Sequence, residues 1–145
     1  MDKYITIRST DSTSYFPDNK PWSFRVNLYD RLYFGKKWAI AVTEIIVQNW
    51  EVSKKSDCHD IYVYSNICHS SHVGERKEPL LRCICLRGNK RDRLFVFPQC
   101  RYIPLKLEDL QIVDIYIQDA DGNPASFITG PVTVTLHLKP QPFWF

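Results

Sequence analysis

The sequence has few of the residues from which common catalytic loops are built. Only five of its 145 residues are glycine, and each lies in or beside a predicted turn. The chain therefore lacks a glycine-rich phosphate-binding loop, and it also lacks a Gly-x-Ser-x-Gly elbow and a His-Glu-x-x-His pair. We accordingly predict that it is not an enzyme of the classes that these motifs identify, and we expect no catalytic residues.

Long apolar runs are also missing. None approaches the roughly 20 residues needed to cross a membrane, and Met1, Asp2 and Lys3 lead directly into a strand-like segment without an apolar signal region. The five cysteines are an odd number, which together with the lack of a secretory signal favours reduced thiols. We expect a protein made in the host cytoplasm or nucleus, not secreted, and without a membrane partner.

Charge of one sign is not in large excess. Nineteen Lys and Arg residues oppose 16 Asp and Glu residues, a formal net charge of +3, which is too small to indicate nucleic-acid binding. The basic excess lies in two predicted loops, Arg76–Lys77 and Arg87–Arg93. Tyr62 and Tyr64 share a strand face and could stack bases, but they serve equally well as packing residues. We do not expect nucleic acid to be the partner.

Aromatic residues, in contrast, are abundant. Four Trp, eight Tyr and eight Phe accompany 44% hydrophobic and 24% charged residues, a composition typical of a globular protein. Aromatic side chains favour strands and are enriched at interfaces. A chain of 145 residues is one ordinary domain and buries roughly 70% of its unfolded surface, so it needs neither a disulfide nor a metal for stability.

Alternation of apolar and polar residues recurs along the whole chain and predicts eight β-strands. No segment has helical periodicity over three turns, and Leu105–Leu110 could form one helical turn at most. Ala125–Thr129 is a candidate for a short ninth strand. The predicted strands are Tyr4–Arg8, Phe24–Tyr29, Trp38–Val47, Asp60–Ile67, Leu80–Arg87, Leu94–Phe97, Leu110–Gln118 and Val132–Lys139.

The links between these segments indicate two packed sheets. Asp121–Gly122 is the best hairpin signal in the chain. Three links, Leu28–Trp38, Val47–Asp60 and Phe97–Leu110, are too long for tight hairpins and are typical of connections that cross between sheets. Eight such strands predict an all-β, antiparallel fold, either a β-sandwich or a jelly roll. We predict one domain over residues 1–139, followed by an aromatic tail over residues 140–145.

The tail and two tryptophans are the candidate interaction residues. Pro140 and Pro142 prevent a regular strand from continuing, and large exposed apolar side chains need a partner. The tail either packs back on its own domain or docks on a neighbouring subunit. The aromatics least explained by inward strand positions, and hence our predicted interface, are Trp22, Trp50, Phe143, Trp144 and Phe145.

The remaining polar candidates have structural interpretations. Zinc requires four converging ligands, and the usual Cys-x-x-Cys spacing is absent, so we predict no metal and no cofactor. The cysteines are expected to be small core residues or free thiols; a metal site and a catalytic Cys-His pair are the alternatives. Glu44 and Asp114 lie within apolar strands, and we expect salt bridges or strand-edge positions for them. The Cys and His residues considered are Cys58, His59, Cys68, His69, Cys83 and Cys85.

An ordered set of short segments resembles one protein family. The N-terminal half resembles the penton-type minor capsid proteins of Polinton or Maverick elements and of adintoviruses, and further matches follow to the end of the chain. The N-terminal matches are Tyr4–Ser9, Phe16–Asn19, Phe24–Leu28 and Trp38–Ile45. The later ones are Ile61–Ile67, Val73–Gly74, Pro79–Arg82, Tyr102–Leu105, Ile115–Asp119 and Phe127–Leu138.

This resemblance implies an eight-stranded single jelly roll that forms homopentamers at the vertices of a virion, beside the major capsid protein. It implies no catalytic residues. The chain departs from the family by lacking an insertion domain or longer arm, and its cysteine-rich segment Cys58–Cys100 exceeds the family pattern. Two alternatives stay open: a β-sandwich module that binds nucleic acid, glycan or protein, and a host-encoded descendant of a capsid protein.

Overall fold

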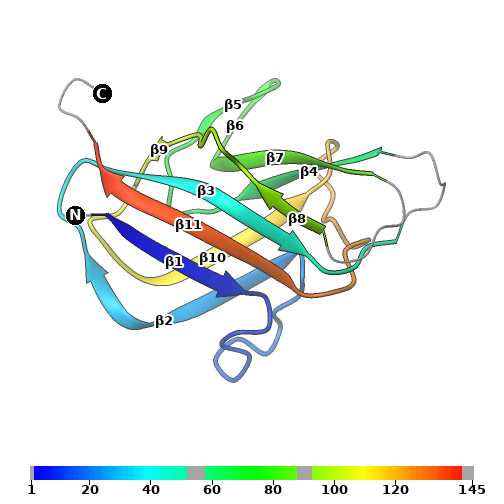
Figure 1. Cartoon of the computed structure of the whole chain (residues 1–145), viewed down its shortest axis with the longest axis horizontal. Helices are drawn as coiled ribbons and strands as arrows, with labels where there is room; N and C mark the ends of the chain where they lie inside the picture. Colours follow the sequence, from blue (N-terminus) through cyan, green and yellow to red (C-terminus); the bar gives the residue numbers. More distant parts are fainter. Residues whose placement is uncertain (1, 52–57, 88–92, 142–145) are drawn as a thin grey trace.

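The computed structural model describes residues 2–51, 58–87 and 93–141, and these residues form an all-β sandwich (Figure 1). They contain eleven strands and no helix. The strands are β1 (Lys3–Arg8), β2 (Ser23–Tyr33), β3 (Trp38–Val47), β4 (Cys58–Tyr64), β5 (Ser71–Val73), β6 (Arg76–Glu78), β7 (Leu80–Arg87), β8 (Arg93–Val96), β9 (Ile103–Pro104), β10 (Asp109–Gln118) and β11 (Val132–Pro140).

The strands form two antiparallel sheets. Sheet A has the order β1-β11-β3-β8, with β9 also paired to β3, and sheet B has the order β2-β10-β4-β7. The short strands β5 and β6 pair only with each other among the described residues. The chain changes sheet between β1 and β2, β2 and β3, β3 and β4, and again after β7, β9 and β10.

The long strands pair in a nested order, in which the strands at the two ends of the chain pair with each other and the middle strands pair with each other. Of eight long strands, the first pairs with the last (β1 with β11) and the second with the seventh (β2 with β10). The third pairs with the sixth (β3 with β8), and the two middle strands, β4 and β7, pair with each other. Two further pairings, β11 with β3 and β10 with β4, then join these pairs into the two sheets.

The core lies between the sheets and follows the alternation in the sequence. In β11 the inward side chains are Val132, Val134, Leu136 and Leu138, all 0% exposed. This alternation places every second residue against the facing sheet, and the predicted inward face of β11 is confirmed. Burial of such side chains contributes about 1.5–3 kcal/mol each.

Three local predictions differ from the structure. Leu105–Leu110 forms no helical turn, because Leu105 makes an isolated bridge to Cys68 and β10 starts soon afterwards. Ala125–Thr129 is not a strand, and its segment is held by an isolated bridge from Ile128 to Trp50. The link from Leu28 to Trp38 is shorter than expected, because β2 continues to Tyr33.

The predicted turn at Asp121–Gly122 is present and is stabilised by one carboxylate. Asp119 Oδ1 accepts hydrogen bonds from the backbone N–H groups of Asp121 and Asn123, both at 2.9 Å. Gly122 has φ +86°, a left-handed conformation that glycine adopts without steric cost. An isolated bridge between Gln118 and Pro124 closes the turn.

Candidate interaction surfaces

The two predicted interface tryptophans occupy different environments. Trp50 is 3% exposed and belongs to the hydrophobic core, so it offers no surface to a neighbour, contrary to its assignment as an interface residue. It is buried because its backbone bridges to Ile128 and the next residue, Glu51, donates to the Phe127 carbonyl at 2.8 Å. Trp22 is half-buried. The tail residues Phe143, Trp144 and Phe145 lie outside the described residues.

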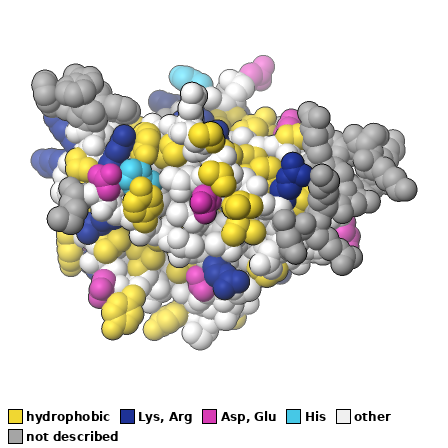
Figure 2. All heavy atoms as spheres, in the orientation of Figure 1, with side chains coloured by type: hydrophobic (Ala, Val, Ile, Leu, Met, Phe, Trp, Pro, Cys, Tyr) yellow, Lys and Arg dark blue, Asp and Glu magenta, His cyan; other side chains and the backbone are white. Residues whose placement is uncertain are grey.

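Sheet A presents a mixed outer face and an apolar edge strand. Figure 2 shows hydrophobic side chains scattered among charged ones over this face. At the edge, Leu94 and Val96 of β8 are 54% and 56% exposed, and they pair in register with Ile46 and Glu44 of β3. An edge strand with outward apolar side chains is a typical site for association with another chain.

Sheet B carries a protruding corner at Tyr29, which we name the Tyr29 bulge (Tyr29–Arg31). The register of β2 against β10 jumps from Asn27↔Ile112 to Leu32↔Leu110, so four residues of β2 face Gln111 alone. Gln111 Nε2 stabilises this irregularity by donating to the Leu28 carbonyl at 2.6 Å and to Asn27 Oδ1 at 3.0 Å.

The Tyr29 bulge and the strand residues beside it expose aromatic and apolar side chains. Tyr29 is 100% exposed, Tyr33 is 73% exposed and Ile112 is 47% exposed. An ion pair between Arg31 Nη1 and Asp109 Oδ2, 3.0 Å long, ties the end of the bulge to β10. The structure therefore holds a fully solvated tyrosine on a supported backbone.

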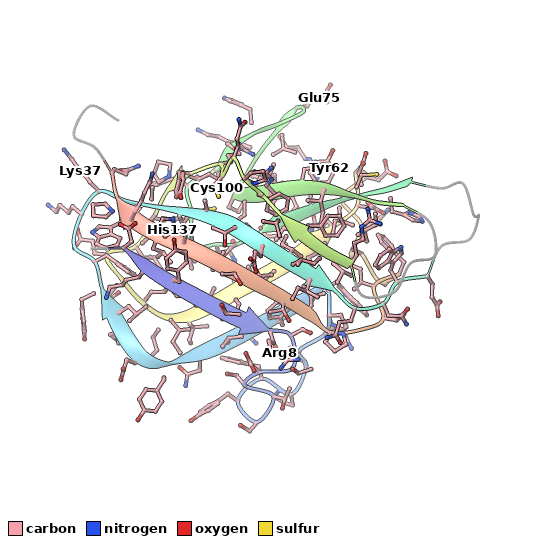
Figure 3. All side chains as sticks on the ribbon, in the orientation of Figure 1. Arg8, Lys37, Tyr62, Glu75, Cys100 and His137 are labelled. Atoms are coloured by element: carbon pink, nitrogen blue, oxygen red, sulfur yellow. The ribbon has the colours of Figure 1, made fainter. Side chains whose placement is uncertain are left out.

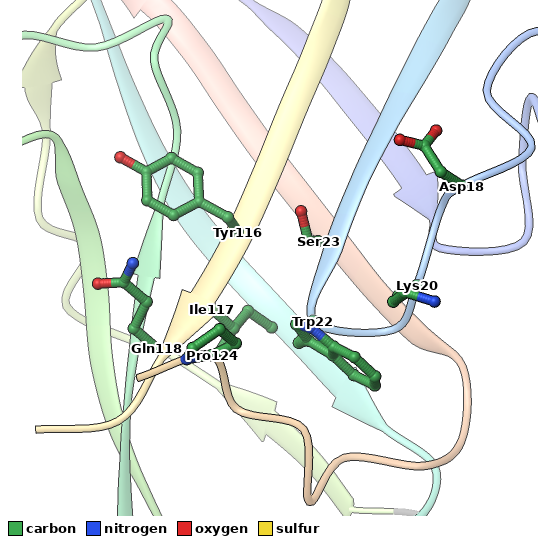
Figure 4. Close-up of a pocket in the computed structure, with 8 residues that line it drawn as sticks. All are labelled: Asp18, Lys20, Trp22, Ser23, Tyr116, Ile117, Gln118 and Pro124. Carbon is green, nitrogen blue, oxygen red and sulfur yellow. The ribbon is translucent and has the colours of Figure 1, made fainter. Parts of the chain in front are cut away.

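A cavity of about 460 Å³ lies beside Trp22, and we name it the Trp22 hollow (Figure 4). Its apolar side chains are Trp22, Tyr116, Ile117 and Pro124, and its polar ones are Asp18, Lys20, Ser23 and Gln118. Backbone hydrogen bonds fix its walls, because Ile117 N–H donates to the Trp22 carbonyl at 2.7 Å and Ala125 N–H donates to the Ile117 carbonyl at 3.0 Å. Lys20 Nζ lies 5.8 Å from the centroid of the Trp22 ring.

A more polar cavity of about 320 Å³ shares Asp18, Ser23 and Tyr116 with the Trp22 hollow. It also contains Asp114, which serves a structural purpose here. The Asp114 carboxylate accepts hydrogen bonds from Ser65 Oγ at 3.2 Å and from the backbone and side-chain nitrogens of Asn66 at 3.1 and 3.0 Å. These bonds, rather than a salt bridge, fix the end of β4 against β10.

Tyrosines cover the middle of the outer face of sheet B. The ring of Tyr64 stacks between those of Tyr62 and Tyr116, with centroids 6.5 and 5.2 Å apart. Tyr64 is 1% exposed, so its ring is not free to stack on a base, and burial raises its pKa. Burial likewise raises the pKa of Tyr116 to about 12.

A cluster of side chains around the buried His137 on sheet A is not among the sequence predictions. His137 Nδ1 shares a 2.6 Å hydrogen bond with Tyr102 Oη, and His137 Nε2 lies 3.0 Å from Asp2 Oδ2 (Figure 3). The His137 ring also stacks on Tyr4 with centroids 4.4 Å apart, and Lys139 Nζ lies 3.9 Å from the Tyr102 centroid. The cluster joins the start of β1 to β11 and to the segment that precedes β9.

Cysteine chemistry differs from the expectation of five reduced thiols. Cys85 is disulfide-bonded, whereas Cys68, Cys83 and Cys100 are free. An odd number of cysteines does not prevent a pair from forming. Cys68 is a core residue, as predicted, at 1% exposure. Among the described residues no three His, Cys, Asp or Glu side chains are grouped to hold a metal ion.

Two further candidates from the sequence are the acidic residue Glu44 and the basic segment Arg87–Arg93. Glu44 is half-buried in β3 opposite Thr135 and Val96, and none of the three ion pairs between described residues includes it. The basic segment Arg87–Arg93 falls mostly outside the described residues.

In the described part of the chain no helix has the length and hydrophobicity to cross a membrane.

Two of the free thiols, Cys83 and Cys68, are expected to react at different rates with an alkylating reagent. Cys83 is exposed, whereas burial raises the pKa of Cys68 to about 12 from 9.0, so the Cys68 thiolate is scarce and inaccessible. Peptide mass spectrometry after brief iodoacetamide treatment should find Cys83 modified and Cys68 intact, with both modified in denaturant. Labelling of native Cys68 at the rate of Cys83 would contradict this assignment.

The same burial sets a direction for alkaline stability. A thiol whose folded pKa lies above its unfolded value binds its proton more tightly in the folded state, so its contribution is complete below the unfolded pKa. For Cys68 this contribution is present below pH 9.0 and is lost as the pH rises toward about 12.

Comparison of the chain with protein-family models and with curated proteins gave no match to either.

Proposed function

We propose that this chain is a structural capsid protein, a single jelly-roll subunit of the penton type that assembles with copies of itself at a virion vertex. The observation that carries the proposal is the inward order of strand pairing: first with eighth, second with seventh, third with sixth and fourth with fifth. A jelly roll is built by wrapping such a four-pair ribbon into two facing sheets, and this architecture is common in viral capsid proteins.

The surface supports assembly as the activity. Strand β8 exposes Leu94 and Val96 along a sheet edge, which favours association with another chain, and the Tyr29 bulge exposes a tyrosine, a residue type enriched at protein interfaces. The ordered resemblance to penton-type minor capsid proteins supplies the rest of the proposal: five subunits in a closed ring, and the major capsid protein of the same particle as the neighbour. A ring requires head-to-tail contacts whose rotation closes.

Assembly is tested by light scattering after size exclusion, combined with negative-stain images of the eluted species. We expect a homopentamer, or a concentration-dependent equilibrium that leads to it. A species that stays monomeric up to high protein concentration would contradict the proposed function. The measurement uses the full chain, so that residues 142–145 are present.

The polar cavity on sheet B favours a second candidate, a β-sandwich module that binds a glycan. It combines a half-buried tyrosine, Tyr116, with the carboxylate of Asp18 and the polar groups of Asn19, Arg25 and Asn66. Aromatic rings with amide, guanidinium and carboxylate groups can contact both faces and hydroxyls of a sugar. A host-encoded descendant of a capsid protein could have this activity.

Saturable binding of oligosaccharides by calorimetry, lost in Tyr116→Ala, would support the glycan module over the capsid subunit. Nucleic-acid binding would instead weaken steeply with added salt. A monomer that binds neither ligand supports neither candidate.

A further inference from the structure

We infer that the Tyr29 bulge of one subunit docks into the Trp22 hollow of a second copy of this chain, a contact that rests on the proposed self-assembly and specifies its anchor. The Tyr29 bulge lies within β2, and the Trp22 hollow lies where β2 starts and β10 ends. The two surfaces consist of different residues, and exposed charges of opposite sign lie beside them.

The two surfaces cannot meet within one molecule. Trp22 lies opposite Ile117 of β10, whose N–H donates to the Trp22 carbonyl. Further along β2, Asn27 lies opposite Ile112, and Tyr29 follows Asn27 in the direction away from Trp22. Five positions of extended strand between Ile117 and Ile112 span about 17 Å, which is longer than a tyrosine side chain. β2 runs along the length of the sandwich and carries the two surfaces apart (Figure 1). Any docking between them therefore occurs between copies.

The Tyr29 bulge has the properties of an anchor. A single exposed apolar residue needs no explanation, but this tyrosine is 100% exposed on a backbone that Gln111 and Asp109 support from β10. A side chain with two rotatable bonds on a supported backbone loses little entropy on binding. Tyrosine is also among the residues that most often dominate interface energies.

The Trp22 hollow has the properties of a receptor for an aromatic ring. Its volume is about 460 Å³ and its walls include the indole of Trp22, the ring of Tyr116 and the side chain of Pro124. Figure 4 shows the Trp22 indole to one side of Ile117 and Pro124. Aromatic pairs are worth about 0.5–1.5 kcal/mol beyond the area that they bury.

Charges beside the two surfaces are complementary. Asp30 is exposed next to Tyr29, and Lys20 is exposed at the hollow. Neither residue belongs to any of the ion pairs between described residues. Docking of Tyr29 would bring Asp30 of one copy close to Lys20 of the other. This attraction favours the correct orientation of the two copies over other orientations.

The contact is head-to-tail, because each copy has one bulge and one hollow at different positions. Such contacts generate rings when the rotation closes and filaments when it does not. One bulge and one hollow per subunit are the minimum that a closed ring of five requires, and the docking itself does not determine the number.

The first test compares self-association of the wild type, Tyr29→Ala and Tyr4→Ala by sedimentation velocity over a range of concentrations. Tyr4 is a matched control, since it is also an exposed tyrosine but lies on β1 of the other sheet, away from both surfaces. We expect Tyr29→Ala to raise the concentration for half-assembly at least tenfold, and to do so more than Tyr4→Ala does. Circular dichroism verifies that each variant is folded.

A charge exchange gives a second and independent measurement. Asp30→Lys and Lys20→Asp should each weaken assembly several-fold, and the double variant should recover most of the loss because the pair is restored with its signs reversed. Both positions are exposed, so neither substitution threatens the fold. Weakening in the singles without recovery in the double variant would contradict direct pairing.

Mixing separates this contact from other modes of assembly. Tyr29→Ala keeps its hollow and Trp22→Ala keeps its bulge, so an equimolar mixture should form heterodimers through one intact contact and nothing larger. If the wild type assembles while Tyr29→Ala assembles at the same concentration, the docking is wrong and the proposed function stands. If the wild type remains monomeric, both are wrong.

Discussion

Trp50→Ala is expected to destabilise the protein by about 3–5 kcal/mol, the usual cost of removing a fully packed aromatic side chain from a core. Trp50 is 3% exposed and packs in the hydrophobic core, where its backbone bridges to Ile128. Because ordinary domains are stable by only about 5–15 kcal/mol, this substitution should remove a large share of the free energy of unfolding. Urea denaturation followed by far-ultraviolet circular dichroism measures it.

Tyr29→Ala is the matched control for this experiment, because it also removes an aromatic ring but at a position that is 100% exposed. A surface substitution of this kind changes stability by at most about 0.5 kcal/mol. Equal effects of the two substitutions under monomeric conditions would contradict the burial of Trp50. The pair thus separates a tryptophan that builds the sandwich from a tyrosine that is free to contact a partner.

Asp114→Ala should cost about 2–3 kcal/mol, since hydrogen bonds to charged groups contribute about 1.5–3 kcal/mol and an unsatisfied buried partner adds to the loss. The carboxylate accepts hydrogen bonds from Ser65 and Asn66 at the end of β4. Ser65 is 0% exposed, so water cannot readily replace the acceptor of its hydroxyl. Thermal denaturation is the simplest measurement.

Asp109→Ala, on the same strand, provides the comparison. Its ion pair with Arg31 joins side chains that are 44% and 48% exposed, and exposed pairs contribute about 0–1 kcal/mol. The account therefore predicts a clear difference between two aspartates of β10. A loss at Asp109 as large as that at Asp114 would show that the Asp114 hydrogen bonds are not the cause.

Strand positions could be predicted from the sequence because inward and outward residues alternate wherever a strand has one face on the core. The inward faces of β2 and β11 follow this rule through Phe24 and Val26, and through Val132 and Val134. The rule ends where strands end. Trp50 lies just outside β3, where its backbone bridges to the distant residue Ile128 and its side chain packs in the core.

The candidate surfaces were less accessible to sequence reasoning, because they depend on irregular backbone and on contacts between distant segments. No glycine or proline marks the Tyr29 bulge in the sequence. Its backbone is supported by Gln111 of β10, whose side chain donates to the Leu28 carbonyl. Trp22 is a predicted interface residue because inward strand positions do not explain it, but the hollow beside it also requires Pro124, which is distant in the sequence. His137 lies on the outward face of β11, as predicted, yet Tyr4 and Tyr102 cover it.

Native mass spectrometry of the full chain tests the central claim most directly, since it counts the subunits in each species. The account predicts a closed assembly of five copies as the largest abundant species, with Tyr29→Ala shifted toward the monomer at the same concentration. A wild-type spectrum that contains only the 17.1 kDa monomer at every concentration would contradict it.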